Sequence, residues 1–585
     1  MARRLGRSEC LDTQVIAATR DPITRGAALG KETPMWQQGY DPLQNPVLST
    51  AVAAIPIVVL LGAIGVVRLK AHYAAAIGLL AALAVAIFVF GMPIGMAGRA
   101  ALNGVGFGLL PIGWIILNVI FLYQLTQECG LFKILQETIA ALTDDGRVQL
   151  LLIAFCFGAF FEGAAGGGTP VAVTGAILIG LGFSPLQASA LSLIANTAPV
   201  AYGGLGTPIF ALQGVTGLDL YQLSGMVGRQ LPFFSLLVPF WLIWAFSGFR
   251  GMLGVWPALL VGGGSFAVSQ FLVSNYSGPL LVDVVSALVS IAALTAFLRI
   301  WQPAHVWPEA VGATLSAAAA VTPKAAQPRH EPGMALRAWA PWIILAVFVF
   351  VWGLPPVKGL LDSVSTVKIP VAGLHELVAR VPPVVVKPTP EAAVYNFNWL
   401  STPGTGVFVA AIVAGLVMGF GVPALVRTYL RTLWLIRYSL LTIACMLALG
   451  YVTRYSGADA TLGLAFAHAG LLYPFFGTML GWVGTALTGT DAASNVLFGS
   501  LQKISAQQLG LDPILMAAAN SSGGVMGKMI DAQSIVVATT ATRWYGHESE
   551  ILRYVFFHSL ALAALVGILV TLQAYVPPFT ALVGW

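Results

Sequence analysis

Charge is the scarcest property of this sequence. Asp, Glu, Lys and Arg together make up 9% of its 585 residues, whereas a soluble domain contains about 25%. Hydrophobic residues make up 58%, so a soluble fold of this composition would expose apolar patches large enough to cause aggregation. The composition therefore excludes an ordinary soluble protein and predicts a chain whose surface is largely covered by membrane lipid.

Cysteine and histidine are also scarce, which argues against several kinds of site. The seven histidines follow no metal-binding spacing, and the four cysteines form no CxxC pair: Cys10, Cys129, Cys156 and Cys445. A disulfide framework, a metal site or a bound cofactor is therefore not expected. The net charge of +6 comes without any run of basic residues, so we expect contact with anionic lipid and no nucleic-acid partner.

Long apolar runs are abundant. A helix needs about 20 apolar residues to cross a bilayer, and many uncharged stretches approach or exceed that length. In the first half they are residues 47–67, 73–98, 100–127, 148–161, 163–218, 230–249, 251–282 and 284–298, and in the second half they are 338–357, 404–426, 438–453, 460–490 and 554–585. The pattern predicts an all-α integral membrane protein with many spans.

Polar segments divide these spans into two halves. We expect an N-terminal segment at 1–46, a first transmembrane repeat at 47–300, a linker at 301–337, and a second repeat at 338–585 that includes an exposed loop at 358–403. Basic residues favour the cytoplasmic side of a membrane. Because Arg299 and Arg337 flank the linker, we expect the linker to be cytoplasmic and the loop to lie on the opposite side.

An acidic residue interrupts the apolar sequence at Glu162, within FFEGAAGGGTPVAV. Six small residues follow it, and Thr169 with Pro170 then suits a helix start, since Thr caps helices and Pro fits the first turn. An ionisable residue inside a membrane is a functional candidate by default, and glycine lets backbone approach a ligand. The same features recur in NTAPVAYGGLGTP, from Asn196. A kinked helix with a glycine packing face is the alternative interpretation.

The second half repeats this layout. TGTDAASNVLFG places Asp491 among small and hydroxyl residues, and NSSGGVMGKM follows from Asn520. Each half thus offers an acid, a helix, and then Asn with hydroxyl residues and a Gly-Gly pair. Such paired interruptions indicate two inverted repeats with a binding site near the middle of the membrane. We expect backbone breaks at 166–168 and at Gly523–Gly524.

These segments suit a small anion and a proton. Helix N-termini and a lysine attract a carboxylate, and Asn and hydroxyl side chains donate hydrogen bonds to it. The candidate substrate-binding residues are Gly163, Gly166, Gly167, Thr169, Asn196, Thr197, Ser494, Asn495, Asn520, Ser521, Ser522 and Lys528. Glu162 and Asp491 are the candidates for proton coupling, because burial favours the protonated form of a carboxyl group. An ion pair with Asp531, three residues further on, is the alternative role for Lys528.

Several motifs, taken together, resemble a known family. They are MWQQGYDP from Met35, FCFGAF from Phe155, IANTAPVAYGGLGTPI from Ile194, GRQLPF from Gly228, WPALLVGGGSFAVSQ from Trp256, NFNWLSTPGTG from Asn396, AANSSGGVMGKMIDAQSI from Ala518 and the two acidic motifs. From about Met35 to Trp585 the chain is similar to the L-lactate permease family of bacterial secondary transporters. It departs at Gly167, where that family typically has a bulky aromatic residue, and at Thr169, where it typically has a small apolar one.

The resemblance implies uptake of L-lactate, and of D-lactate and glycolate as related 2-hydroxymonocarboxylates, in symport with protons across the bacterial inner membrane. It also implies the fold of the ion-transporter superfamily, with inverted repeats, re-entrant hairpins, broken helices and elevator motion. Because the family usually begins near Met35, residues 1–34 are expected to be an extension or the result of a misassigned start. The oligomeric state stays open, with a homo-oligomer among the options.

Three other functions are alternatives to this one. Paired backbone breaks also coordinate Na⁺ through carbonyl groups, so a sodium-coupled carboxylate transporter of the same superfamily is the main alternative. A channel is disfavoured by the paired interruptions. A membrane enzyme would need a nucleophile–base or metal constellation, and the sequence suggests no such cluster.

Overall fold

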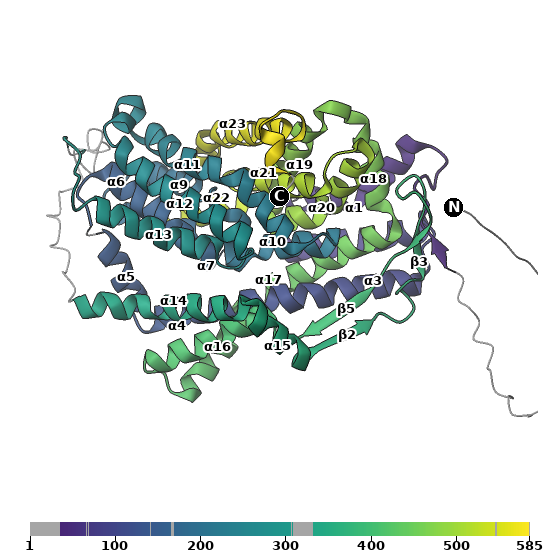
Figure 1. Ribbon diagram of the computed structural model, residues 1–585, viewed down its shortest axis with the longest axis horizontal. Helices are drawn as coiled ribbons and strands as arrows, with labels where there is room; N and C mark the ends of the chain where they lie inside the picture. Colours follow the sequence, from purple (N-terminus) through teal and green to yellow (C-terminus); the bar gives the residue numbers. More distant parts are fainter. Residues whose placement is uncertain are drawn as a thin grey trace, which may run out of the picture.

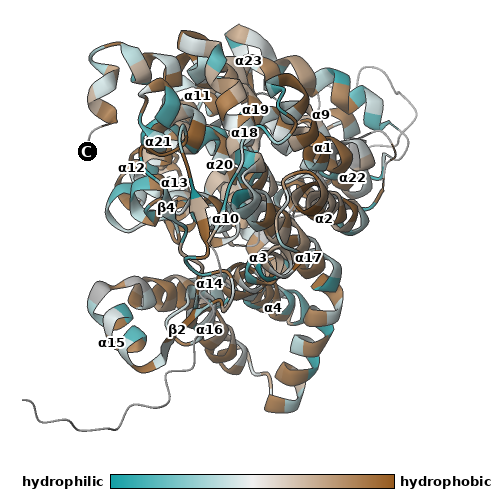
Figure 2. Ribbon diagram, turned by 90° about the vertical axis from the view of Figure 1, so that its right-hand side faces the viewer, coloured by the Kyte–Doolittle hydropathy of each residue, from teal (hydrophilic) through white to brown (hydrophobic). Residues whose placement is uncertain are grey.

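The computed structural model describes residues 35–65, 67, 69–140, 142–164, 166, 169–305, 307, 332–544 and 547–583. The expected extension and most of the expected linker lie outside these residues. Within them, seven helices are long and apolar enough to cross a membrane, or eight if one bent pair is a single span. Hydrophobic residues cover most of the helices (Figure 2). The all-α expectation is therefore confirmed in outline, with short strands added to it.

One group of helices, which we call the α17 layer, includes those along the lower side of Figure 1. It consists of α1 (Pro46–Gly65), α2 (Ala71–Phe88), α3 (Ile94–Phe107), η1 (Gly108–Gly113), α4 (Trp114–Glu128), α5 (Leu131–Ala140), α14 (Pro332–Gly353), α15 (Pro355–Ser365), α16 (Pro403–Val417) and α17 (Val422–Ser456). The long helix α17 packs on α2, α3 and α4, which joins the layer along its length.

The remaining helices form the α20 layer, which lies above α4, α14 and α16 in Figure 1, with α1 beside it. From the first half come α6 (Gly146–Leu150), η2 (Leu151–Phe157), α7 (Gly158–Ala164), α8 (Thr169–Gly180), α9 (Pro185–Ala195), η3 (Val200–Tyr202), α10 (Gly203–Thr216), α11 (Leu220–Leu253), α12 (Trp256–Tyr276) and α13 (Val282–Phe297). From the second half come α18 (Ala458–Phe466), η4 (Ala467–Leu472), α19 (Tyr473–Thr488), α20 (Asp491–Leu509), α21 (Pro513–Gly527), α22 (Ala532–Ala541), α23 (Glu548–Tyr575) and η5 (Phe579–Leu582). Contacts of α20 with α10 and of α21 with α11 interleave the two halves of the chain.

Short helices of the α20 layer meet end to end at backbone breaks. Between α19 and α20, Gly489 has φ +81° and Thr490 caps the next helix by accepting a hydrogen bond from the Ala493 N–H at 3.1 Å. Before the regular part of α10, residues 204–206 have φ values of +53°, +56° and +75°. Between α21 and α22, Asp531 caps the new helix. Polar caps therefore satisfy backbone groups that would otherwise be costly to bury, and glycine allows the backbone to leave the helical path.

The break expected at Gly523–Gly524 is not there. Helix α21 runs through both glycines, and the chain leaves the helical path only after Gly527. A Cβ at Gly523 would overlap the carbonyl oxygen of Thr478, and one at Gly524 would overlap the Asp491 carboxylate. These glycines therefore allow α21 to approach α19 and α20 closely, which is the packing role that small residues have between membrane helices.

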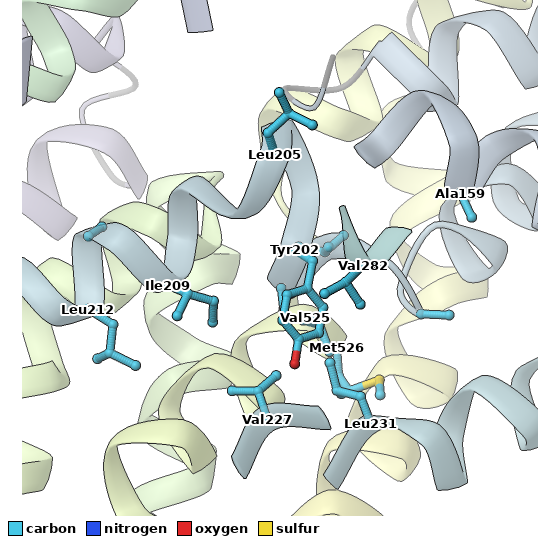
Figure 3. Close-up of a cluster of buried hydrophobic side chains, with 14 of the residues drawn as sticks. Ala159, Tyr202, Leu205, Ile209, Leu212, Val227, Leu231, Val282, Val525 and Met526 are labelled. Carbon is cyan, nitrogen blue, oxygen red and sulfur yellow. The ribbon is translucent and has the colours of Figure 1, made fainter. Parts of the chain in front are cut away.

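A buried aromatic residue anchors the break between α9 and α10. The Tyr202 ring lies among apolar side chains that include Val227 of α11, Val282 of α13 and Val525 of α21 (Figure 3). Its hydroxyl donates a 2.6 Å hydrogen bond to the Ser224 carbonyl on α11. The irregular segment is thus held in the core by apolar burial and by one satisfied polar contact.

The segment expected as an exposed loop, 358–403, is folded. It contains the end of α15 and four strands, β2 (Thr366–Pro370), β3 (Val378–Arg380), β4 (Thr389–Pro390) and β5 (Val394–Asn398), of which β2 pairs antiparallel with β5 and β3 antiparallel with β4. The N-terminal strand β1 (Trp36–Gln37) pairs parallel with β3. Glu391 pairs with Arg380 of β3 within this segment and, at 2.7 Å, with Arg454 at the end of α17. The second pair ties the segment to the helices.

We expect Glu391→Gln to loosen this attachment. Burial raises the pKa of Glu391, but the charges of Arg454 and Arg380 outweigh burial and hold the pKa below its usual value. Removing the acid leaves two partly buried guanidinium groups uncompensated, which costs about 3 kcal/mol. Thermal unfolding of the purified protein should show the loss, and the exposed Glu376→Gln serves as the control. Equal melting temperatures for the two variants would contradict a stabilising role.

Candidate functional site

A cavity of about 370 Å³ lies between the two layers. The α17 layer contributes α1, α2, η1, α4 and α17 to its wall, mostly through apolar side chains, and the α20 layer contributes α7, α10, α20 and the residues at the helix breaks. Its polar wall residues are His72, Glu162, Thr207, Tyr438, Ser439, Thr442, Thr488, Thr490, Asp491, Lys528 and Gln533. The cavity has the size of a small-molecule site, which is typically about 300–1,000 Å³.

Glu162 is presented to this cavity by the last turn of α7. Its side chain is 3% exposed, and its Oε2 accepts a 3.0 Å hydrogen bond from the Asn196 Nδ2. A Cβ at Gly203 would overlap its Oε1. Gly166 has φ +60°, and a Cβ added to it would lie 3.2 Å from the Gly204 nitrogen at the neighbouring break. The carboxyl group therefore sits where two broken segments of the first half meet.

Asp491 occupies the corresponding position in the second half, as the first residue of α20. Its side chain is 2% exposed, and its Oδ2 accepts hydrogen bonds from Ser521 at 2.5 Å and from Asn495 at 3.3 Å. Its Oδ1 lies against Gly524. Two donors and the N-terminus of a helix thus stabilise a negative charge at this buried position.

The two acidic motifs converge as predicted, because Glu162 and Asp491 line the same cavity. The Nδ2 of Asn495 also donates to the Pro208 carbonyl of α10 at 3.1 Å, which links the halves directly. Ser522 adds a second link, a 2.6 Å hydrogen bond from its hydroxyl to the Gln230 Oε1 on α11. The site is therefore assembled from segments that are far apart in the sequence, from 287 positions for Pro208 and Asn495 to 329 for Glu162 and Asp491.

Lys528 adds a positive charge to the cavity wall. Its Nζ donates to the Gly489 carbonyl at 2.5 Å and lies 3.2 Å from an Asp531 oxygen, so the predicted ion pair is present. It is 3% exposed and interacts electrostatically with both Glu162 and Asp491. The ion pair and a cavity-facing role are thus compatible, because the pair fixes the ammonium group at the break beside α20.

Other predicted site residues lie behind the cavity wall. Asn520 donates to the Asn495 Oδ1 at 2.9 Å and Ser494 donates to the Gly481 carbonyl at 3.0 Å, so both support other polar groups. Thr197 donates to the Ile194 carbonyl, and Gly163 packs against α13. Gly167 and the Thr169 side chain lie outside the described residues. Of the predicted binding residues that the structure describes, Gly166 and Lys528 line the cavity.

Sequence reasoning missed part of the wall. Thr207, Thr488 and Thr490 flank the breaks, and the Gly-Thr-Pro and Thr-Gly-Thr-Asp patterns contain a signal that could have identified them. His72 and Tyr438 stack with their ring centroids 4.5 Å apart. No local pattern marks that pair, because its members come from separate helices of the α17 layer. Among the described residues, no three His, Cys, Asp or Glu side chains are grouped as a metal site.

Comparisons with known proteins find relatives that match most of the chain in sequence. Residues 49–577 match the family model described as L-lactate permease. The chain is 47% identical over 551 residues to the glycolate permease GlcA of Escherichia coli (strain K12), which covers 92% of this chain and 98% of that protein. It is 44% identical over 548 residues to the L-lactate permease of Salmonella typhimurium (93% and 98%) and 43% identical over 558 residues to that of Bacillus subtilis (strain 168) (92% and 99%).

A solved structure is more distantly similar. The YdaH transporter of Alcanivorax borkumensis aligns over 90% of this chain and 98% of its own with a TM-score of 0.41 and 13% identity. That value is too low for the alignment to support a shared topology.

Proposed function

The chain belongs to the L-lactate permease family, and we propose that it takes up L-lactate, D-lactate and glycolate in symport with protons. It is a multi-pass protein of the bacterial inner membrane and a permease by family. The observation that carries the proposal is the shared cavity, in which two buried acids, Lys528 and the helix breaks meet. A 2-hydroxymonocarboxylate needs a cation for its carboxylate and hydrogen-bonding groups for its hydroxyl, and this wall offers both.

We assign the anion-binding role to Lys528 and to the helix start around Thr490. The N-terminus of α20 directs free N–H groups and a partial positive charge toward an anion. Asp491 holds Asn495 and Ser521 in place and, through them, the contact with α10. Glu162 is the proton-coupling residue, since it faces the cavity with one hydrogen-bond donor and no ion pair among the described residues.

We also propose that the two layers move relative to each other, as in an elevator. The acids and Lys528 all belong to the α20 layer, whereas the α17 layer contributes mainly apolar wall residues such as Ile116, Ile443 and Met446. Because the α20 layer holds all the charged groups of the site, it can carry the ligand along the mainly apolar surface of the α17 layer. In the first half, breaks separate α7 from α8 and α9 from α10. In the second half, breaks separate α19 from α20 and α21 from α22. This matching order supports two inverted repeats.

Uptake by reconstituted protein tests the proposed function. Proteoliposomes that contain the purified protein should accumulate labelled L-lactate when the interior is alkaline, with Na⁺ absent on both sides. Unlabelled D-lactate and glycolate should compete, and acetate, which lacks the hydroxyl group, should compete weakly. Accumulation that follows a Na⁺ gradient and ignores the pH gradient would replace the proposal with sodium coupling.

We expect Lys528→Met to weaken substrate binding. The variant removes the positive charge from the cavity wall but leaves Asp531 buried without its partner, so misfolding would confuse the result. The double variant Lys528→Met/Asp531→Asn removes both charges and still lets residue 531 cap α22. A KM for L-lactate raised about tenfold in the double variant, at normal membrane abundance, would fit an anion contact. An unchanged KM would show that Lys528 does not contact the substrate and only forms a structural ion pair with Asp531.

A further inference from the structure

A third buried acid lies next to the site. Asp283, in the first turn of α13, is 1% exposed. Neither of its carboxyl oxygens has a hydrogen-bond partner among the described residues. The sequence does not predict that Asp283 is buried and unpartnered. It stands between two apolar stretches, where a polar turn at the membrane surface would be ordinary. A carboxylate buried with neither a cation nor a donor is strongly disfavoured, so the ground state of Asp283 is protonated.

Asp283 adjoins Glu162 through a glycine. A Cβ at Gly163, the residue after Glu162, would lie 2.6 Å from the Asp283 Cβ and 3.0 Å from the Val284 nitrogen. The glycine that was expected to approach the substrate therefore creates the space in which α13 packs against α7. The titratable groups that interact with Asp283 from the surrounding elements are Glu162 of α7 and Tyr202 of η3.

The surroundings of the three acids differ in a way that separates their roles. Asp491 accepts hydrogen bonds from two side chains, which compensate a negative charge. Glu162 accepts one from Asn196 and lines the cavity, whereas Asp283 accepts none and is not part of the described wall. Two features still allow Asp283 to release its proton: the positive end of α13, and the Ser286 hydroxyl one turn along, which also lacks a partner among the described residues.

We propose that Asp283 is a second proton-binding site of the transport cycle, so that two protons, one on Glu162 and one on Asp283, accompany each hydroxy acid anion. The inference rests on the proposed proton symport. Glu162 at the cavity wall exchanges protons with the cavity, and Asp283 behind it exchanges through Glu162. Both residues belong to the α20 layer and travel together. Two protons with one anion move one net positive charge inward, so transport responds to membrane potential.

The accumulation ratio at a fixed pH gradient tests this, because it depends on the number of coupled protons and not on the transport rate. Each coupled proton contributes about tenfold per pH unit when the membrane potential is clamped at zero. Wild-type proteoliposomes should approach about 100-fold accumulation of L-lactate per pH unit, and Asp283→Asn about 10-fold. An interior-negative potential should raise uptake in the wild type but not in Asp283→Asn.

Thr295→Val is the matched control, since Thr295 lies near the other end of α13, its hydroxyl also lacks a partner among the described residues, and the change removes no titratable group. This variant should keep the 100-fold ratio. Infrared spectra of purified Asp283→Asn should also lose absorption from a protonated carboxyl group at neutral pH. A ratio of about 10-fold in the wild type, or equal ratios in wild type and Asp283→Asn, would overturn the second proton site while leaving the proposed symport intact. A wild type that ignores the pH gradient would overturn both.

Discussion

Replacing Glu162 by glutamine is expected to abolish proton-driven accumulation of L-lactate while exchange across the membrane continues. Glutamine has the same shape, and its carbonyl oxygen can still accept the hydrogen bond from Asn196. It cannot bind and release a proton, and it also closes the route from the cavity to Asp283. In proteoliposomes with an alkaline interior, the variant should bring internal L-lactate only to the external concentration.

Counterflow separates loss of coupling from loss of folding in this experiment. Vesicles preloaded with unlabelled L-lactate should take up labelled L-lactate through Glu162→Gln at a measurable rate, since this exchange needs no net proton movement. The control Glu376→Gln alters an exposed carboxylate in the folded segment after α15, and it should accumulate substrate normally. Wild-type accumulation by Glu162→Gln would remove this residue from the coupling mechanism.

Gly203→Ala is expected to have the second-largest effect, because the added methyl group would occupy the position of the Glu162 carboxylate. The backbone at Gly203 has φ −57° and ψ 150°, which alanine adopts without strain. The acid must therefore turn away from Asn196, and the proton-binding group is displaced from its cavity position. Misplacement of a reacting group by about 1 Å lowers rates about 100-fold, and we expect a loss of this order in proton-driven uptake.

Gly264→Ala provides a matched comparison for this substitution. Gly264 also lies in the α20 layer, on α12, and a Cβ added there meets no atom within 4 Å. That variant should transport like the wild type, with equal amounts of both variants recovered from the membrane. Normal uptake by Gly203→Ala would show that the Glu162 carboxylate does not need its present position.

Local sequence chemistry is sufficient to predict several features of this protein. The low charge content predicts a membrane protein because lipid is the only solvent that such a composition tolerates. The motifs around Glu162 and Asp491 identify two acids that line one cavity. The Gly-Gly pair in the motif from Asn196 predicts an interrupted helix, and Gly204 and Gly206 have positive φ values, which glycine adopts readily and other residues rarely.

Tertiary packing decided the remainder. A Gly-Gly pair is the same sequence signal whether it breaks a helix or admits a neighbour, and only the approach of α19 and α20 to Gly523–Gly524 shows that α21 continues. The proximity of Asp283 to Glu162, and the contribution of His72 and Tyr438 to the wall, depend on helices that are distant in the sequence. Sequence patterns report which residues are buried, because burial follows local periodicity. They predict which buried groups meet only where a repeated layout pairs two segments, as it does for the two acidic motifs. The other contacts depend on how separate helices pack.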